Sequence, residues 1–119
     1  MKLTKREEQI MDYLWENGPS FVKDIKASFD DPQPHYNTVS TLVRNLEQKN
    51  MIDHEDFGTT YRYFAAVSKE EFVKNNLKND VRKYFDNSYK SLVSSLVESN
   101  DLTLDEINEL IELAKRKSK

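Results

Sequence analysis

The chain has 119 residues, enough for one medium-sized domain or two small ones, and its 18 basic and 21 acidic side chains give a net charge of −3. The absence of cysteine excludes disulfides, thiolate catalysis and cysteine-based metal sites; with only His35 and His54 as imidazoles, no metal or other cofactor is expected. No apolar stretch approaches the roughly 20 residues that span a bilayer, and no signal peptide is evident, so we expect a cytoplasmic protein.

Two helices are predicted in the first 30 residues. Thr4 and Glu7 have the spacing of a capping box, in which each side chain satisfies the other's backbone amide, and apolar residues then recur on one helical face. The Gly-Pro pair at residues 18–19 ends this helix. Residues 22–29 place apolar side chains at helical spacing, which predicts a second, shorter helix that ends at the polar run DDPQP.

The third predicted helix, residues 36–49, has two unlike faces. At 100° per residue its apolar side chains fall on one side, whereas the far side carries hydroxyl, amide and guanidinium groups and no carboxylate. Such groups hydrogen-bond base edges and phosphates in a major groove, although a merely solvated polar face is the plainer alternative. The outward residues are Asn37, Ser40, Thr41, Arg44 and Gln48.

A two-stranded hairpin is predicted next, because IDHEDF and YRYFAAV flank the turn GTT. Three helices followed by a hairpin is the order of a winged helix-turn-helix, in which the third helix enters the major groove. The hairpin, residues 52–66, is then the wing along the DNA backbone. Arg62 points to the opposite side of its strand from Tyr61 and Tyr63, where it either reaches a phosphate or is simply exposed.

Three amphipathic helices are predicted after Ser68, the last of them capped by Thr103 and Glu106. About 50 residues have too little volume to enclose three apolar stripes, so we expect a second copy of the chain to cover them. The fold is then mainly α with a small β-hairpin, divided into a winged-helix domain at 1–67 and a helical dimerisation domain at 68–119. Packing against the first domain is the alternative. The expected dimer residues are Val81, Phe85, Tyr89, Leu92, Val93, Leu96, Val97, Ile107, Leu110 and Ile111.

Four segments together carry a resemblance to a known family: LTKREEQIMDYLWENG, YNTVSTLVRNLEQKNMI, YRYFAAVSKEEF and SLVSSLVESNDLTLDEINEL. Over nearly its whole length the sequence resembles the BlaI/MecI/CopY penicillinase-repressor family of bacterial transcriptional regulators. The resemblance implies a homodimeric repressor that binds a palindromic operator in double-stranded DNA. It implies recognition-helix positions at Asn37, Thr38, Ser40, Thr41 and Arg44, of which Thr38 lies nearer the flank of the helix.

Several positions depart from the family's pattern. In relatives that control β-lactamase genes, a membrane sensor-protease pathway leads to cleavage of an Asn-Phe bond in the dimerisation helices, where this chain has Ser95-Leu96. The copper-responsive branch uses a C-terminal cysteine motif, which this chain lacks. Asn45 and Asn50 stand where relatives usually have Arg and Gly. The resemblance implies release by disruption of the dimer. The absence of cysteine disfavours copper sensing.

The charge distribution keeps a second function open. Residues 1–66 carry 8 basic and 11 acidic side chains, a net of −3, which is unusual for a DNA-binding domain. A winged helix that serves as a protein–protein interaction module is therefore the alternative. An enzyme is not expected, because neither histidine lies at a catalytic motif spacing and no glycine-rich phosphate loop is present.

Overall fold

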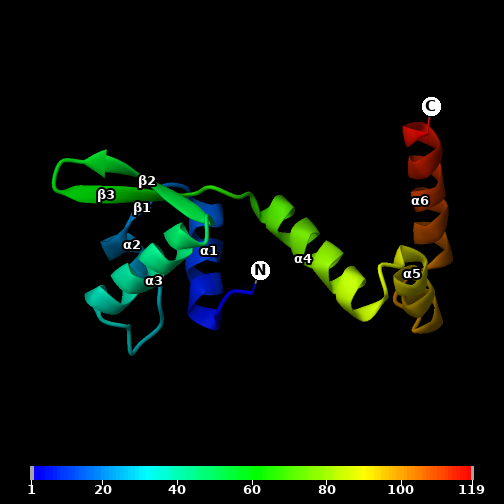
Figure 1. Cartoon of the computed structure of the whole chain (residues 1–119), viewed down its shortest axis with the longest axis horizontal. Coiled ribbons are helices and arrows are strands. Elements are labelled where there is room, and N and C mark those ends of the chain that lie inside the picture. Colours follow the sequence, from blue (N-terminus) through cyan, green and yellow to red (C-terminus); the bar gives the residue numbers. More distant parts are fainter. Residues whose placement is uncertain (1, 119) are drawn as a thin grey trace. The chain divides into compact units, whose positions relative to one another are not determined.

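The computed structural model describes residues 2–118, and its elements follow the order expected from the sequence (Figure 1). Most of the described chain is helical, and the strands form a small antiparallel sheet. The elements are α1 (Lys5–Asn17), β1 (Ser20–Phe21), α2 (Val22–Ala27), α3 (Tyr36–Gln48), β2 (Ile52–Phe57), β3 (Thr60–Ala65), α4 (Lys69–Tyr84), α5 (Tyr89–Glu98) and α6 (Leu104–Lys117).

The chain consists of two compact units, Met1–Lys74 and Asn75–Lys119, and the division between them falls inside α4. The first unit includes the beginning of α4. Trp15 Nε1 donates a hydrogen bond to the Val67 carbonyl, just before the helix, at 2.8 Å, and the Trp15 ring packs on Phe72 within it. The assignment of a DNA-binding domain to 1–67 and a dimerisation domain to 68–119 stays a prediction.

Local signals in the sequence set the helix ends. Thr4 Oγ1 accepts a hydrogen bond from the Glu7 amide at 3.2 Å, and the Glu7 carboxylate accepts one from the Thr4 amide at 2.9 Å. Thr103 and Glu106 form the same reciprocal pair at the start of α6, so both predicted capping boxes are confirmed. Helix α1 ends at Gly18, whose φ of 77° lies in the region that favours glycine.

One apolar core joins the three helices and the sheet of the first unit. Each fully buried aliphatic or aromatic side chain contributes about 1.5–3 kcal/mol to folding. Helix α3 contributes three of these side chains, which orient its opposite side away from the core. The buried members are Ile10, Met11, Leu14, Val22, Ile25, Phe29, Val39, Val43, Leu46, Met51, Ile52 and Tyr63.

The sheet contains a strand that the sequence pattern does not predict. Strand β1 pairs antiparallel with β3, placing Ser20 opposite Tyr63 and Phe21 opposite Arg62, so the strand order is β1-β3-β2. A two-residue strand has no period to recognise, which explains why the hairpin alone was expected. The predicted hairpin of β2 and β3 is confirmed, and Gly58 occupies its turn with a φ of 63°.

A buried carboxylate links α1 to the residue that follows α3. Glu7 is 2% exposed, and its two oxygens accept hydrogen bonds from Lys49 Nζ at 2.8 and 2.9 Å. Burial alone raises the pKa of Glu7, but the Lys49 hydrogen bond, the Thr4 amide and the Lys49 charge outweigh it, so this pKa lies below its ordinary value. The end of α3 is thereby held against α1.

Replacement of Lys49 by methionine is expected to lower the free energy of unfolding by about 1–2 kcal/mol at neutral pH, because Glu7 is left buried without its cation. The pKa of Glu7 is depressed by folding, so its contribution is present above the ordinary value of 4.5 and is lost as pH falls through the lower folded value. Urea unfolding followed by circular dichroism should therefore show a difference between wild type and Lys49→Met that shrinks with acidification. The matched control is Lys5→Met on the exposed side of α1. Equal unfolding midpoints for Lys49→Met and wild type at neutral pH would contradict this role.

The second unit leaves most of its apolar side chains uncovered. Among its described residues, Val81 is the one apolar side chain that is fully buried. Leu104 is 71% exposed, and large apolar side chains on α4, α5 and α6 are also in contact with solvent. None of the helices in the part of the chain that the structure describes has the length and apolar character needed to cross a membrane.

Candidate nucleic-acid interface

The outward side of α3 carries the polar residues that the sequence singled out. Asn37, Thr41 and Arg44 are exposed, whereas Thr38 and Ser40 are half-buried at its edges. Thr41 Oγ1 donates a hydrogen bond to the Asn37 carbonyl at 2.9 Å, which fixes the hydroxyl rotamer and leaves its lone pairs free to accept. This side of the helix therefore offers amide, hydroxyl and guanidinium groups close to the backbone.

A surface hollow of about 350 Å³ connects this side of α3 to the wing. Asn37, Ser40 and Arg44 line it from the helix, and Tyr61 and Tyr63 line it from β3. Helix and wing therefore form one concave polar surface. Thr59 of the hairpin turn and Thr60 at the start of β3 also line the hollow; both lie in the predicted wing, but the sequence analysis did not name them as site residues. Their position at the tip of a predicted wing was the available signal.

Tyr36 is another residue of this surface that the sequence analysis missed. It is the first residue of α3, about half exposed, and it lines the same hollow. Tyr36 precedes the apolar residues that repeat at helical spacing, so the periodicity did not show on which side of α3 its ring lies. His35 occupies the N-cap position of α3, and its side chain makes no capping hydrogen bond.

Arg62 is engaged within the wing. Its Nη2 donates a hydrogen bond to the Glu55 carboxylate at 3.0 Å, and its guanidinium lies 4.6 Å from the centre of the Phe57 ring. The side chain points to the opposite side of β3 from Tyr61 and Tyr63, as strand alternation predicts, so it faces away from the hollow. A phosphate would have to compete with Glu55 for this guanidinium. The assignment of Arg62 to a DNA contact stays a prediction.

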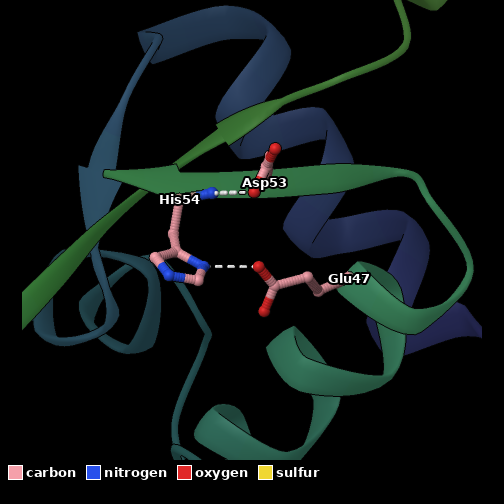
Figure 2. A group of neighbouring side chains, drawn as sticks. All are labelled: Glu47, Asp53 and His54. Atoms are coloured by element: carbon pink, nitrogen blue, oxygen red, sulfur yellow. Dashed lines mark hydrogen bonds and ion pairs between the residues drawn. The ribbon is translucent and has the colours of Figure 1, made fainter. Parts of the chain in front are cut away.

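Glu47 on α3 and His54 on β2 are in direct contact (Figure 2). The Glu47 carboxylate meets His54 Nδ1, and the imidazole packs on the Tyr61 ring with centroids 4.2 Å apart. The hydrogen bond with Glu47 raises the pKa of His54 above 6.5; burial opposes this shift, and the charges of Glu47, Asp56 and Asp53 reinforce it. The sequence analysis gave His54 no role in the site, because its partner Glu47 lies seven positions away on another element and no motif links the two.

Asp53 lies beside this pair, and the potential ligand atoms of Asp53, Glu47 and His54 are all within 4.8 Å of one another. The Asp53 carboxylate, however, accepts a hydrogen bond from the His54 backbone amide at 2.8 Å. Figure 2 shows the Asp53 carboxylate on the other side of the strand from the His54 ring, as expected for neighbouring strand residues. The Glu47 carboxylate is bound to the imidazole and the Asp53 carboxylate to the His54 backbone amide, and we assign no metal to the three side chains.

Most of the predicted dimer residues form exposed apolar surface on the second unit. Val81 is the exception, because it is fully buried within the chain and cannot contribute to that surface. Leu104 and Leu113 are exposed and were not in the predicted set. The half-buried members are Phe85, Leu92 and Ile107, and the exposed members are Tyr89, Val93, Leu96, Val97, Leu110 and Ile111.

A family model described as penicillinase repressor matches residues 3–116, which is nearly the whole chain. The chain belongs to the penicillinase repressor family. Methicillin resistance regulatory protein MecI of Staphylococcus aureus strain N315 is 26% identical over 121 residues, covering 98% of this chain and 95% of MecI. The penicillinase repressor of Bacillus licheniformis is 20% identical over 117 residues, covering 94% of this chain and 88% of that protein.

Among solved structures, a complex structure of hsRosR-S4 is similar with a TM-score of 0.55, at 14% identity over 84% of this chain and 90% of that one. At this identity the likeness concerns the fold alone. Penicillinase repressors are transcriptional regulators and not enzymes, in agreement with the sequence analysis. Within this family member, the polar side of α3 and the wing beside it form the candidate interface with nucleic acid.

Proposed function

We propose that this penicillinase repressor family member binds operator DNA as a homodimer in the cytoplasm, with α3 of each subunit in a major groove and the wing at 52–66 along the backbone. The observation that carries the proposal is the outward side of α3, which presents Asn37, Ser40, Thr41 and Arg44 next to the wing. Bidentate guanidinium and amide groups are the side chains that distinguish bases in a major groove. The core residues on the other side of α3 hold this orientation.

Charge explains why two copies are needed. Residues 1–66 carry a net charge of −3, so a single winged helix neutralises few phosphates and should bind DNA weakly. When two copies are joined, the second contact becomes intramolecular, which strengthens binding by roughly 10² to 10⁴. Occupancy of the operator then depends on the stability of the dimer.

The exposed apolar side chains of the second unit support dimerisation through residues 68–119. Soluble monomers rarely leave large contiguous apolar surface uncovered, and a second copy can cover the same surface on both subunits. Tyr89, Val93 and Val97 border one surface hollow on α5, and Leu110 and Leu113 border another on α6. Separation of these helices would release the repressor without any change at α3.

Proteolysis through a membrane sensor-protease pathway is one proposed way to separate them. Ser95 and Leu96 lie inside α5 and are exposed to solvent. Their backbone is helical, so cleavage at Ser95-Leu96 would require local unwinding of α5. A cut at this bond would detach α6 from the first part of the dimer surface.

The direct test is binding of the full chain to duplex DNA of random sequence, followed at rising salt concentration. We expect measurable binding at low salt and a linear fall of the logarithm of the association constant with the logarithm of salt concentration, since phosphate contacts release counterions. Selection of tight binders from the same random pool should then yield palindromes with half-sites about 34–36 Å apart. A protein–protein interaction module would show no salt-sensitive DNA binding, and that result would overturn the proposal.

A further inference from the structure

Glu47 places a carboxylate at the edge of the proposed DNA-binding surface. It lies in the last turn of α3, about one helical turn beyond Arg44, and its side chain is 29% exposed. An unpaired carboxylate at this position would repel the phosphates that the surface must approach. The His54 side chain, 30% exposed on β2, is the group that contacts it (Figure 2).

The surroundings of His54 are acidic and aromatic. From β2, Asp53 contributes a negative charge, and the Asp56 carboxylate lies 4.0 Å from His54 Nε2. From β3, the rings of Tyr61 and Tyr63 lie 4.2 and 5.8 Å from the imidazole centroid.

From α3, Glu47 contacts the imidazole directly, while Arg44 and Tyr36 act on the neighbouring Tyr63. Burial raises the pKa of Tyr63, and the charge of Arg44 opposes that rise. His54 is thus in contact with one carboxylate and near two others, so protonation of its ring neutralises the charge of its direct partner Glu47 and lowers the local negative charge from three to two.

We propose that His54 and Glu47 are positioning residues whose ion pair holds the wing against the last turn of α3 and neutralises Glu47, so that DNA binding strengthens when His54 is protonated. The proposal rests on the proposed function, because it concerns the same surface. With a neutral imidazole, the contact is weaker and Glu47 keeps its negative charge beside the DNA. With a charged imidazole, both the geometry of the wing and the local potential favour binding.

Linkage fixes the direction of the pH dependence. The pKa of His54 in the free protein is already above 6.5, and nearby phosphates raise it further in the complex. DNA binding therefore takes up protons, and affinity falls as pH rises from the free to the bound value. Each subunit contributes one His54, so uptake at this site is limited to two protons per dimer. If one proton is taken up per dimer, affinity changes about tenfold per pH unit.

The experiment measures fluorescence anisotropy of a labelled random-sequence duplex with the full chain, at constant ionic strength between about pH 6 and about pH 9. Wild type should lose affinity as pH rises, by about tenfold for each pH unit over which one proton per dimer is taken up. His54→Gln should flatten the profile, because glutamine does not titrate. Glu47→Gln should move the fall in affinity to lower pH, because it removes the main cause of the raised His54 pKa. His35→Gln is the matched control and should keep the wild-type profile.

The outcomes separate this proposal from the proposed function. A wild-type profile in His54→Gln, or a flat profile in His35→Gln alone, would overturn the assignment to His54. DNA binding with no pH dependence in wild type would overturn this proposal and leave the proposed function standing. Absence of duplex binding at every pH would overturn both. If circular dichroism shows that His54→Gln is folded and its pH profile is flattened, the result supports a role of His54 protonation in DNA binding and not only in folding.

Discussion

A chain that carries both Leu92→Asp and Leu96→Asp is expected to sediment as a monomer and to bind duplex DNA roughly 10² to 10⁴ times more weakly than wild type. Both residues lie on α5, where Leu92 is half-buried and Leu96 is 36% exposed, on the side that carries Tyr89. An aspartate buried in an apolar interface without a partner is strongly unfavourable. Because a single winged helix binds weakly, loss of the dimer removes most of the affinity even though α3 is unchanged.

The matched control places the same two charges, at the same spacing, on exposed serines of the same helix that do not line the α5 hollow, through Ser91→Asp and Ser95→Asp. This variant should remain a dimer and keep its affinity for DNA. Sedimentation equilibrium and gel-shift titration at fixed salt measure the two properties separately. An unchanged dimer in the leucine variant would reject this side of α5 as the interface. A monomer with undiminished DNA affinity would instead reject bivalence.

Much of the fold could be predicted because its signals are local. The capping box of Thr4 and Glu7 fixes the start of α1 within four residues of sequence, and the apolar period of residues 39–46 fixes which side of α3 packs. The outward polar set on α3 follows from the same period. These features depend on neighbours along the chain, so one sequence is sufficient to find them.

Contacts between distant residues could not be predicted in the same way. Glu7 and Lys49 are 42 positions apart, and nothing in either segment indicates that the Lys49 ammonium is the partner of the Glu7 carboxylate. The contact between Glu47 and His54 depends on how the hairpin folds back on α3. Strand β1 exists because Ser20–Phe21 meets the exposed edge of β3, which is a property of the assembled sheet.

Periodicity also does not predict which group an apolar side chain packs against or a charged side chain pairs with. Val81 lies on the apolar stripe of α4, but the stripe does not tell whether its own chain or a second copy covers it; the structure buries it internally. Strand alternation gave the correct side for Arg62. It did not reveal that the register places Glu55 directly opposite, where the two side chains form an ion pair. Specific pairing depends on register, which one strand alone does not define.

Arg44→Ala is expected to weaken binding to the selected operator by about 1–3 kcal/mol while the dimer stays intact. Arg44 is exposed on α3 and lines the hollow shared with the wing. Its guanidinium offers two parallel donors to a guanine edge, or a bidentate contact to a phosphate. Gel-shift titration at fixed salt gives the affinity, and sedimentation confirms the dimer. Arg82→Ala is the matched control, because Arg82 bonds Asn79 within α4 and its loss changes the net charge equally.

Two further comparisons decide which contact Arg44 makes. Loss of a base contact should weaken the operator more than a random duplex and relax specificity at one base pair, whereas loss of a phosphate contact should weaken both equally and reduce the salt slope by about one. Arg44→Lys keeps the charge but not the planar pair of donors, so it should restore a phosphate contact and fail to restore a base contact. Equal operator affinity for Arg44→Ala and wild type would exclude Arg44 from the interface. Because Arg44 is the basic residue of α3, that result would leave the helix to act through its amides and hydroxyls alone.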